Sequence, residues 1–259
     1  MPRLMRTAFS AIVLAALTLV HFPLPPASAQ TRESVDLLLV LAADVSRSVD
    51  GPKFQLQREG YAAALSDPRV LDAIRSGPNG RIAILFLEWS GQFAQRVVVD
   101  WTIIKDAQSA RQAGDHLLEA PRSFAERTSI SAAIDFSVEL LDKAPFEAAR
   151  RTIDVSGDGT NNSGRDVQLA RNAALKKGIT INGLVILSDQ PLPWNPDHTH
   201  PPGGLEHYYR ENVIGGAGAF VLAAENFASF GRALTNKLVA EIAGRPAPAK
   251  EAMMIERAE

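Results

Sequence analysis

Three oxygen-bearing side chains alternate along one short stretch of the sequence: Asp44, Ser46 and Ser48. They follow an apolar run from Leu37 to Ala43, and a segment of helical character comes next. A continuous apolar run is typical of a strand covered on both faces, so the oxygens would lie on the turn at its end. Carboxylate and hydroxyl oxygens are ligands for hard divalent cations such as Mg²⁺ or Ca²⁺. One stretch cannot enclose an ion, so further oxygens must come from elsewhere.

Two later positions offer such oxygens. Thr128 lies at the end of a polar loop, and Thr128-Ser129 is expected to form the N-cap of the helical segment with an apolar stripe that follows. Asp158-Gly159 follows the short strand pattern of residues 151–155. In open α/β sheets, ligands bind at the carboxyl ends of the strands, near the point where the strand order reverses. We therefore expect Asp44, Thr128 and Asp158 on one edge of a sheet.

Strand and helix patterns alternate along the chain, which indicates a doubly wound α/β fold. The link between strands 81–89 and 95–101 is too short for a parallel crossover, so these two should form an antiparallel hairpin. The sequence thus predicts a mostly parallel sheet with one antiparallel edge strand and helices on both faces. The other expected strands are 37–43, 151–155, 179–187 and 219–222, and the expected helices are 53–65, 70–75, 107–118, 130–141, 166–177, 206–213 and 226–242. Residues 188–205, rich in proline and histidine, should be irregular.

The composition restricts the function classes. The 259 residues are 46% hydrophobic and 22% charged, as in ordinary globular proteins. A net charge of −2 favours neither nucleic acid nor an anionic membrane surface. Cysteine is absent, which excludes disulfides, thiolate metal sites and a cysteine nucleophile.

The first residues have the organisation of a secretory signal peptide. Arg3 and Arg6 precede an apolar run over residues 8–20, and Ala27-Ser28-Ala29 provides a small-residue cleavage site. The alternative, a membrane anchor, needs roughly 20 apolar residues and this run is shorter. We expect residues 1–29 to be removed, a single domain over 30–243, a flexible tail over 244–259, no membrane span in the mature chain, and a secreted or periplasmic location.

The arrangement Asp-x-Ser-x-Ser, a later Thr before a helix and Asp-Gly after a middle strand resembles the von Willebrand factor A-type domain. The resemblance covers roughly residues 36–242. It implies a metal-ion-dependent adhesion site (MIDAS) that holds Mg²⁺, or Mn²⁺ or Ca²⁺, and leaves one coordination position open for an acidic residue of a protein partner. The matching positions are Asp44, Ser46, Ser48, Thr128 and Asp158.

A narrower resemblance concerns three stretches, residues 57–61, 155–162 and 212–216, which are similar to a group of exported bacterial proteins, DUF1194, within the same superfamily. Two positions depart from the A-type pattern, because Arg47 and Arg127 stand where glycine is common. These arginines would repel a cation, receive an anionic partner, or extend into solvent.

Other side chains are weaker candidates. His198 and His200, with Asp197 and His207 nearby, have the residue types of a transition-metal site, but a proline-rich loop offers no regular scaffold, so an exposed loop is the favoured interpretation. Asp154, inside an apolar strand, is expected to be a hydrogen-bonded structural carboxylate. Glu88 would at most support a metal ligand. Ser46 as a nucleophile would need a base, and no histidine lies near the expected site in the sequence.

The function that the sequence predicts is therefore non-enzymatic: an exported binding protein that contacts a protein partner through a divalent cation. Two alternatives remain open. One is a metal-dependent hydrolase that uses the same oxygen cluster to activate water. The other is a scaffold without a metal, in which Arg47 and Arg127 disable the site.

Overall fold

The order of the strands places the two aspartates of the expected site on neighbouring strands. The computed structural model describes residues 32–244, and its main sheet has the order β4-β3-β2-β6-β7-β8. The β3–β4 pair is antiparallel and the other pairs are parallel, which confirms the predicted fold class. The strands are β2 (Leu38–Asp44), β3 (Ile82–Trp89), β4 (Gln95–Ile104), β6 (Arg151–Gly157), β7 (Thr180–Ile186) and β8 (Val221–Ala224).

The reversal of strand order falls between β2 and β6. From β2 the chain builds outward to β3 and β4, and then returns to the other side of β2 to form β6. Every residue of β2 is buried, because β3 and β6 flank it and helices cover both faces, as its unbroken apolar run predicted. The carboxyl ends of β2 and β6 therefore meet at the place where α/β folds bind ligands.

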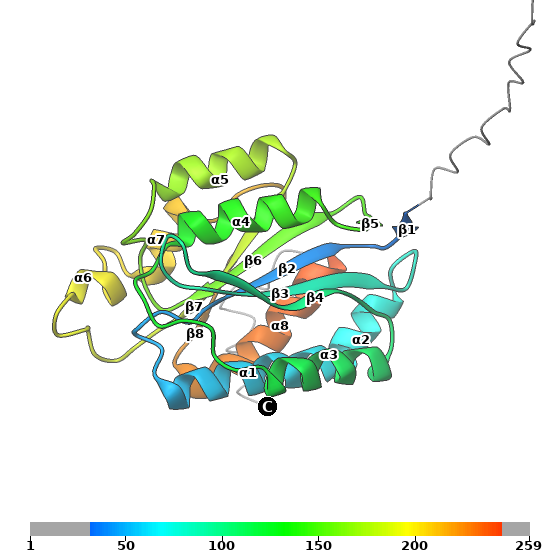
Figure 1. Ribbon diagram of the computed structural model, residues 1–259, viewed down its shortest axis with the longest axis horizontal. Coiled ribbons are helices and arrows are strands. Elements are labelled where there is room, and N and C mark those ends of the chain that lie inside the picture. Colours follow the sequence, from blue (N-terminus) through cyan, green and yellow to red (C-terminus); the bar gives the residue numbers. More distant parts are fainter. Residues whose placement is uncertain (1–31, 245–259) are drawn as a thin grey trace, which may run out of the picture. The chain divides into compact units, whose positions relative to one another are not determined.

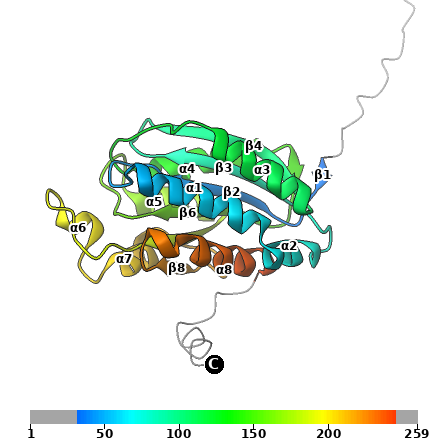
Figure 2. The same cartoon turned by 90° about the horizontal axis from the view of Figure 1, so that it is seen from below.

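Seven helices form the two outer layers of the described residues (Figures 1 and 2). One layer packs on the sheet through Tyr61, whose ring lies edge-on to Phe86 and Phe230 at centroid distances of 4.7 and 5.4 Å. It contains α1 (Gly51–Ser66), α2 (Pro68–Arg75), α3 (Ala107–Glu119) and α8 (Phe230–Ala243). The opposite layer contains α4 (Ile130–Asp142), α5 (Val167–Lys176) and α7 (Leu205–Asn212).

The helix termini follow local sequence signals. Ser129 caps α4 by accepting a hydrogen bond from the backbone N–H of Ala132, as its position before the apolar stripe predicted. Asp166 caps α5 in the same way, and Gly178 follows the helix with a φ of 71°, a conformation that glycine adopts without steric cost.

The structure differs from the prediction in four places. The loop at 188–204 is not wholly irregular, because it contains the short helix α6 (Pro196–Thr199). Strand β8 begins two residues later than expected, and the one-turn helix η1 (Phe227–Ser229) precedes α8. Two short strands, β1 (Glu33–Ser34) and β5 (Phe146–Glu147), pair in a sheet of their own. A two-residue strand has no periodicity, so the sequence contains no signal for it.

The expected signal peptide, residues 1–29, and all but the first residue of the expected tail lie outside the described residues. Among the helices over 32–244, none combines the length and the apolar character that crossing a bilayer requires.

Candidate metal site

The turn after β2 holds its aspartate by hydrogen bonds to the turn itself. Asp44 is the last residue of β2 and is fully buried. Its Oδ1 accepts a hydrogen bond from the N–H of Ser46 at 2.7 Å, and its carbonyl accepts one from Gln57 Nε2 at 3.2 Å. One carboxylate oxygen thus orders the turn that carries the two serines, and the other, Oδ2, makes no hydrogen bond with the described residues.

The hydroxyls of that turn connect it to the loop after β6. Ser46 Oγ lies 3.2 Å from Ser48 Oγ, and Ser48 Oγ donates to Asp158 Oδ1 at 2.6 Å. Asp158 follows β6 directly and is 4% exposed. The predicted proximity of Asp44, Ser46, Ser48 and Asp158 is therefore seen in the structure.

Thr128 is held against the same loop by two asparagine contacts. Its N–H donates to Asn162 Oδ1 at 3.0 Å, and its carbonyl accepts from the N–H of Asn162 at 2.9 Å. Asn161 Oδ1 accepts from the N–H of Ser131 at 3.0 Å, at the start of α4. The loop that bears Thr128 and the loop that bears Asp158 are thus tied together, and Asn161 and Asn162 position the first relative to the second.

The side chains of Arg122 and Glu88 bind backbone groups of the turn after β2 and of the loop that leads to Thr128. Arg122 Nη2 donates to the carbonyls of Val45, Ser46 and Val49 at 2.8, 3.1 and 2.6 Å. Glu88, at the end of β3, accepts from Ser123 N–H at 3.0 Å and forms a buried ion pair with Arg58 at 2.5 Å. The sequence predicts a supporting role at most for Glu88, and no local pattern signals the contacts of Arg122.

Burial dominates the electrostatics of both aspartates. It raises the pKa of Asp44 well above 3.8, and the nearby Asp158 carboxylate raises this pKa further. It also raises the pKa of Asp158, against the opposing effects of the Ser48 hydrogen bond and of Lys53. Without a cation, the chain holds two carboxylates together in a place that disfavours their charge.

A comparison with the other buried acids shows how unusual this pair is. Five carboxylates are buried among the described residues, and Glu88, Asp154 and Glu241 each form an ion pair with a buried Arg or Lys. Neither Asp44 nor Asp158 forms an ion pair within residues 32–244. Asp44 Oδ2 is buried with no hydrogen-bond partner there, as are Asp154 Oδ2 and Glu241 Oε2, but those two acids are compensated by Lys237. An unpartnered buried carboxylate oxygen beside hydroxyls fits a bound cation.

The region above Gly157 has a second unpartnered polar atom. The hydroxyl of Tyr209, from α7, is buried without a partner among the described residues. A Cβ on Gly157 would lie 2.6 Å from that hydroxyl and 3.2 Å from Asp44 Oδ2. Gly157 therefore keeps open the space that both polar atoms face.

The structure corrects the interpretation of His198. The sequence analysis favoured an exposed loop and found no histidine near the site, yet His198 is only 4% exposed and its Nε2 lies 3.3 Å from Thr128 Oγ1. Burial lowers its pKa, an effect that Asp158 opposes. Helix α6 brings it to the metal edge from 70 residues away in sequence, a contact that no local pattern signals.

The remaining histidines of that region do not form a metal cluster. His200 and His207 are exposed, and within residues 32–244 no three His, Cys, Asp or Glu side chains lie close enough together to hold an ion. A cation at this edge would therefore depend on the hydroxyl oxygens as well as on the carboxylates.

A cavity of about 300 Å³ opens over the hydroxyls of Ser46, Ser48 and Thr128. Arg47 and Arg127, both exposed, line it, and so do His198 and Trp194, of which Trp194 is 70% exposed. Glu126 lines it as well, so the cavity combines the hydroxyl oxygens with two arginines, one glutamate and an aromatic ring.

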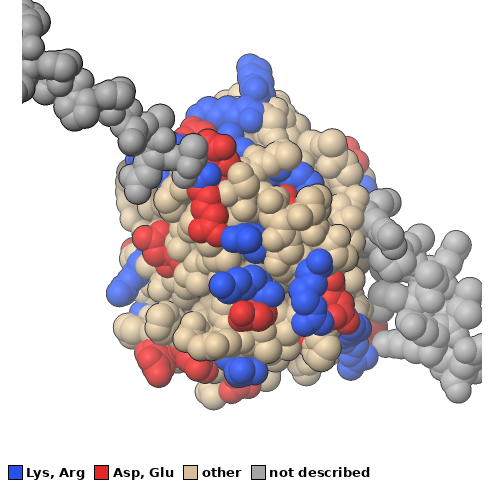
Figure 3. Space-filling model, turned by 90° about the vertical axis from the view of Figure 1, so that its right-hand side faces the viewer, with Lys and Arg blue, Asp and Glu red and all other residues tan. Residues whose placement is uncertain are grey.

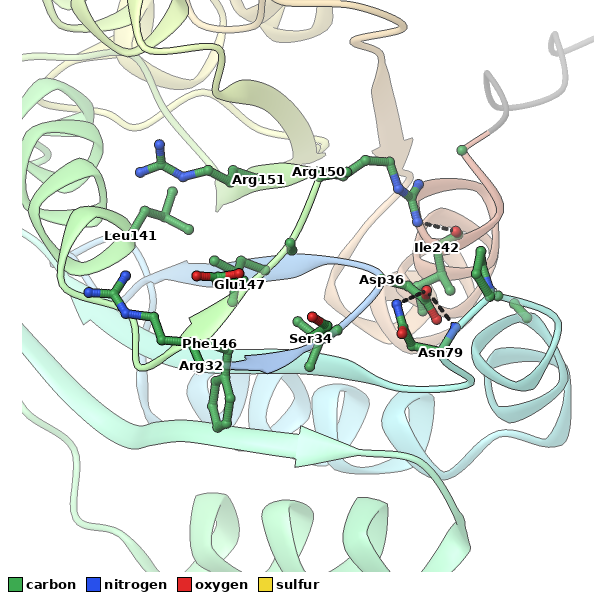
Figure 4. A pocket seen from close by; sticks show the side chains of 18 of the residues that line it. Arg32, Ser34, Asp36, Asn79, Leu141, Phe146, Glu147, Arg150, Arg151 and Ile242 are labelled. Atoms are coloured by element: carbon green, nitrogen blue, oxygen red, sulfur yellow. Dashed lines mark hydrogen bonds between the residues drawn. The ribbon is translucent and has the colours of Figure 1, made fainter. Parts of the chain in front are cut away.

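A larger cavity, of about 1070 Å³, lies at the opposite end of the strands, near β1 and β5 (Figure 4). Several of its charged groups are engaged with other side chains or with backbone. Arg150 donates to the carbonyls of Glu241 and Ile242 at the end of α8, and Asp36 accepts from the N–H and Nδ2 of Asn79. Acidic and basic side chains are interspersed on the face shown in Figure 3. The cavity is larger than the one over the hydroxyls, but none of the buried unpartnered polar atoms of residues 32–244 lines it, so we place the candidate site at the metal edge.

Comparisons with known proteins agree with this architecture. The family model described as "Protein of unknown function (DUF1194)" matches residues 34–246. Comparison with curated proteins gives no significant match.

Three solved structures illustrate the fold. They are proximal thread matrix protein 1 from the mussel byssus with a zinc-occupied MIDAS motif (14% identity, TM-score 0.56, 82% of this chain and 49% of that chain), the pilus adhesin SpaC from Lactobacillus rhamnosus GG (11%, 0.55, 82% and 31%) and a von Willebrand factor type A protein from Catenulispora acidiphila (15%, 0.51, 83% and 47%). The chain matches less than half the length of each. At these identities the similarity concerns the fold alone.

Proposed function

The chain belongs to the DUF1194 family and has the fold of von Willebrand factor A-type domains, and from that premise we propose that it binds a protein partner through a divalent cation. Asp44, Ser46, Ser48, Thr128 and Asp158 would hold the cation, directly or through water. When bound, the cation supplies a positive centre that attracts an anionic group of the partner.

One observation carries the proposal: the buried carboxylate pair of Asp44 and Asp158 has no compensating ion pair among residues 32–244. Burying two carboxylates near each other is costly unless they are protonated or paired. Hydroxyls from two further positions face the same cavity, and hydroxyl and carboxylate oxygens are ligands of Mg²⁺, Mn²⁺ and Ca²⁺. A cation from solution would satisfy all of these groups together.

The margin of the cavity supports an acidic protein partner. Arg47 and Arg127 add positive charge that attracts a carboxylate approaching the cation, and guanidinium groups bind carboxylates bidentately. Trp194 adds an exposed aromatic surface, and aromatic residues are enriched where protein partners make their strongest contacts. On this model the arginines select the partner and do not disable the site.

Two of the similar proteins have names that fit this proposal: one has a zinc-occupied MIDAS motif and another is a pilus adhesin. We extend the proposal to the cell location expected from the first thirty residues, so that the partner is met outside the cytoplasm. The hydrolase alternative needs a base beside the cation, and His198 is the residue at the site that could serve as one; in the structure its Nε2 contacts the Thr128 hydroxyl.

The proposal is tested in two steps. First, titration calorimetry and thermal unfolding measure binding of Mg²⁺, Mn²⁺ and Ca²⁺ to the wild type, to Asp44→Ala and to the control Asp115→Ala, an exposed aspartate on α3. We expect the wild type and the control to bind at least one of these cations and Asp44→Ala to bind none.

Second, a random peptide library is selected on the immobilised protein in that cation and eluted with chelator. We expect the eluted peptides to be enriched in Asp or Glu from the wild type and not from Asp44→Ala. Equal cation binding by the wild type and Asp44→Ala would exclude the site, and peptides without acidic enrichment would exclude the proposed partner chemistry.

A further inference from the structure

We propose that His198 is an additional ligand of the same cation through Nε2, so that the site takes transition-metal dications such as Co²⁺ or Zn²⁺ in preference to Mg²⁺. The inference rests on the proposed function, because it concerns the ion held by Asp44, Ser46, Ser48, Thr128 and Asp158. Since no three His, Asp or Glu side chains of residues 32–244 lie close enough together to hold an ion, at least one of the two carboxylates would act through water when His198 binds directly. It adds a nitrogen donor from a part of the chain that the oxygen ligands do not come from.

The position of the ring is that of a neighbouring ligand. His198 Nε2 lies 3.3 Å from Thr128 Oγ1 and lines the cavity into which the hydroxyls of Ser46 and Ser48 face. Two donors at adjacent corners of an octahedron, each about 2.1 Å from the ion, are roughly 3 Å apart. The hydrogen-bond distance between Nε2 and Oγ1 is close to this value, so a small movement would let both atoms bind one cation.

The ring is held at this position by the protein. The imidazole lies against Gly159, where a Cβ would overlap the ring. The backbone of His198 is fixed at both ends, because its N–H donates to the carbonyl of Asn195 at 3.1 Å and its carbonyl accepts from the N–H of Thr160 at 2.9 Å. Gly159, next to Asp158, thus leaves space for the His198 ring.

The far side of the ring has the contacts that a ligating histidine needs. Nδ1 lies 3.3 Å from both Thr160 Oγ1 and Asn162 Nδ2. When Nε2 binds an ion, Nδ1 carries the proton and donates it to Thr160 Oγ1, as metal-bound imidazoles donate to a nearby oxygen. Without an ion, Asn162 Nδ2 donates to Nδ1, and Nε2–H donates to Thr128. Moving between the two states exchanges tautomers of a neutral ring.

A nitrogen ligand changes which ions the site prefers. Mg²⁺ and Mn²⁺ suit carboxylate, carbonyl and water oxygens, and Mg²⁺ retains its waters, whereas imidazole is a good ligand for Zn²⁺. Affinities of first-row dications for a given site increase from Mn²⁺ to Co²⁺, with Zn²⁺ below Cu²⁺. The hydroxyl oxygens alone would not discriminate in this way.

The test measures metal selectivity and nitrogen coordination separately. Affinities for Mg²⁺, Mn²⁺, Co²⁺ and Zn²⁺ are determined by calorimetry for the wild type, His198→Ala, His198→Gln, Asp44→Ala and the control His116→Ala, an exposed histidine on α3. Pulsed electron paramagnetic resonance of the Mn²⁺-loaded protein detects ¹⁴N coupling from a directly bound imidazole. Circular dichroism and thermal unfolding without metal establish that each variant is folded.

We expect the wild type to bind Co²⁺ and Zn²⁺ more tightly than Mg²⁺ and to show the ¹⁴N coupling. Loss of the ligand should weaken Co²⁺ and Zn²⁺ binding by at least about 10-fold in both His198 variants, and remove the ¹⁴N coupling, with the control unchanged. Unchanged Co²⁺ and Zn²⁺ affinity in both His198 variants, or no ¹⁴N coupling in the wild type, would overturn the inference. If Asp44→Ala still abolishes binding in that case, the proposed function stands; if it does not, both fail.

Discussion

Two pairs of buried carboxylates lie at this sheet, and they differ in the source of the positive charge that can compensate them. Asp154, on β6, and Glu241, on α8, share the ammonium group of Lys237, which is 2.6 Å from Asp154 Oδ1 and 2.7 Å from Glu241 Oε1. Asp44 and Asp158 lie at the end of the strands, and no described ion pair involves either of them. The first pair is compensated by a lysine of the same chain, and the second lies next to hydroxyls that line a cavity.

Whether the buried charge is compensated within the protein distinguishes a structural cluster from a candidate binding site. The Lys237 cluster is closed: all of its side chains are at most 5% exposed, and Asn182 Nδ2 also donates to Glu241 at 2.6 Å. Removing one partner there leaves an uncompensated charge inside the protein. At the metal edge, Asp44 and Asp158 already lack a compensating ion pair without any substitution, so a bound cation can supply the missing positive charge.

The largest effect is expected from removing the internal cation. Lys237→Met leaves Asp154 and Glu241 buried without their ammonium group and should lower the free energy of unfolding by about 3–5 kcal/mol. Urea unfolding at pH 7 measures it. Lys105→Met, at an exposed lysine, is the control and should change stability by less than about 0.5 kcal/mol. Equal effects of the two variants would show that Lys237 does not compensate the internal pair.

The second prediction concerns the cation at the metal edge. At about 100 times its dissociation constant, a bound cation should stabilise the wild type by about 2.7 kcal/mol, which raises Tm by roughly 5–10 °C. Asp44→Asn should lose this shift and, in chelator, should unfold at a higher temperature than the wild type because it no longer buries an uncompensated carboxylate. Differential scanning calorimetry with and without cation measures both. A lower Tm for Asp44→Asn in chelator would contradict the comparison.

The third prediction concerns how the stabilities of the wild type and Asp44→Asn depend on pH. Burial raises the folded-state pKa of Asp44 and Asp158 above 3.8, so the folded state retains protons that the unfolded state has released. Their contribution is therefore most favourable below pH 3.8 and is lost as the pH rises through the folded-state values. In chelator, the stability advantage of Asp44→Asn over the wild type should grow from pH 4 to pH 7, as urea unfolding at each pH would show.

The stabilities of the wild type and Asp44→Asn must be compared at each pH, because other acids also make the free energy of unfolding depend on pH. Hydrogen bonds lower the pKa of Asp67, Asp106 and Asp142, so they stabilise the fold as the pH rises from the acid range. Burial raises the pKa of Asp154 to about 7, and its contribution is lost between about pH 4 and 7 in both proteins. An advantage of Asp44→Asn that does not change with pH would argue against a raised pKa at Asp44.

The smallest effect is expected at the margin of the cavity. Arg127 is exposed, so Arg127→Ala should leave cation affinity and Tm unchanged. It should slow association with an acidic peptide selected on the wild type by about two- to fivefold at low salt, and less at high salt. Surface plasmon resonance at two salt concentrations measures this, with Arg75→Ala on α2 as the control. A salt-independent effect would mean that Arg127 acts by packing.

The sequence predicted the parts of this molecule that follow from local patterns. The apolar runs at 37–43, 81–89 and 179–187 are strands, and Asp44 and Asp158 meet because parallel neighbouring strands end at the same edge. The N-cap at Ser129 followed from residue type and position. These predictions rest on period and residue type, which are properties of a few consecutive residues.

The contacts that the sequence did not predict join distant parts of the chain. His198 reaches Thr128 across 70 residues, Arg122 reaches Val45 across 77, and Lys237 on α8 pairs with Asp154 on β6. A proline-rich loop has no periodicity that says which way a histidine faces. An aspartate within an apolar strand indicates a partner but does not identify it, so Asp154 was expected to be structural while Lys237 remained unrecognised.

The attachment of the site to the middle of the sheet has a mechanical consequence. Asp44 ends β2 and Asp158 follows β6, and these strands pair in parallel with each other and with β3 and β7. Tension applied at this edge along the strands loads their slanted, evenly spaced hydrogen bonds together, in shear, so they cannot open one at a time. The domain is therefore built to resist a pull at the metal edge, and would yield more readily to a force that peels β4 or β8 from the side.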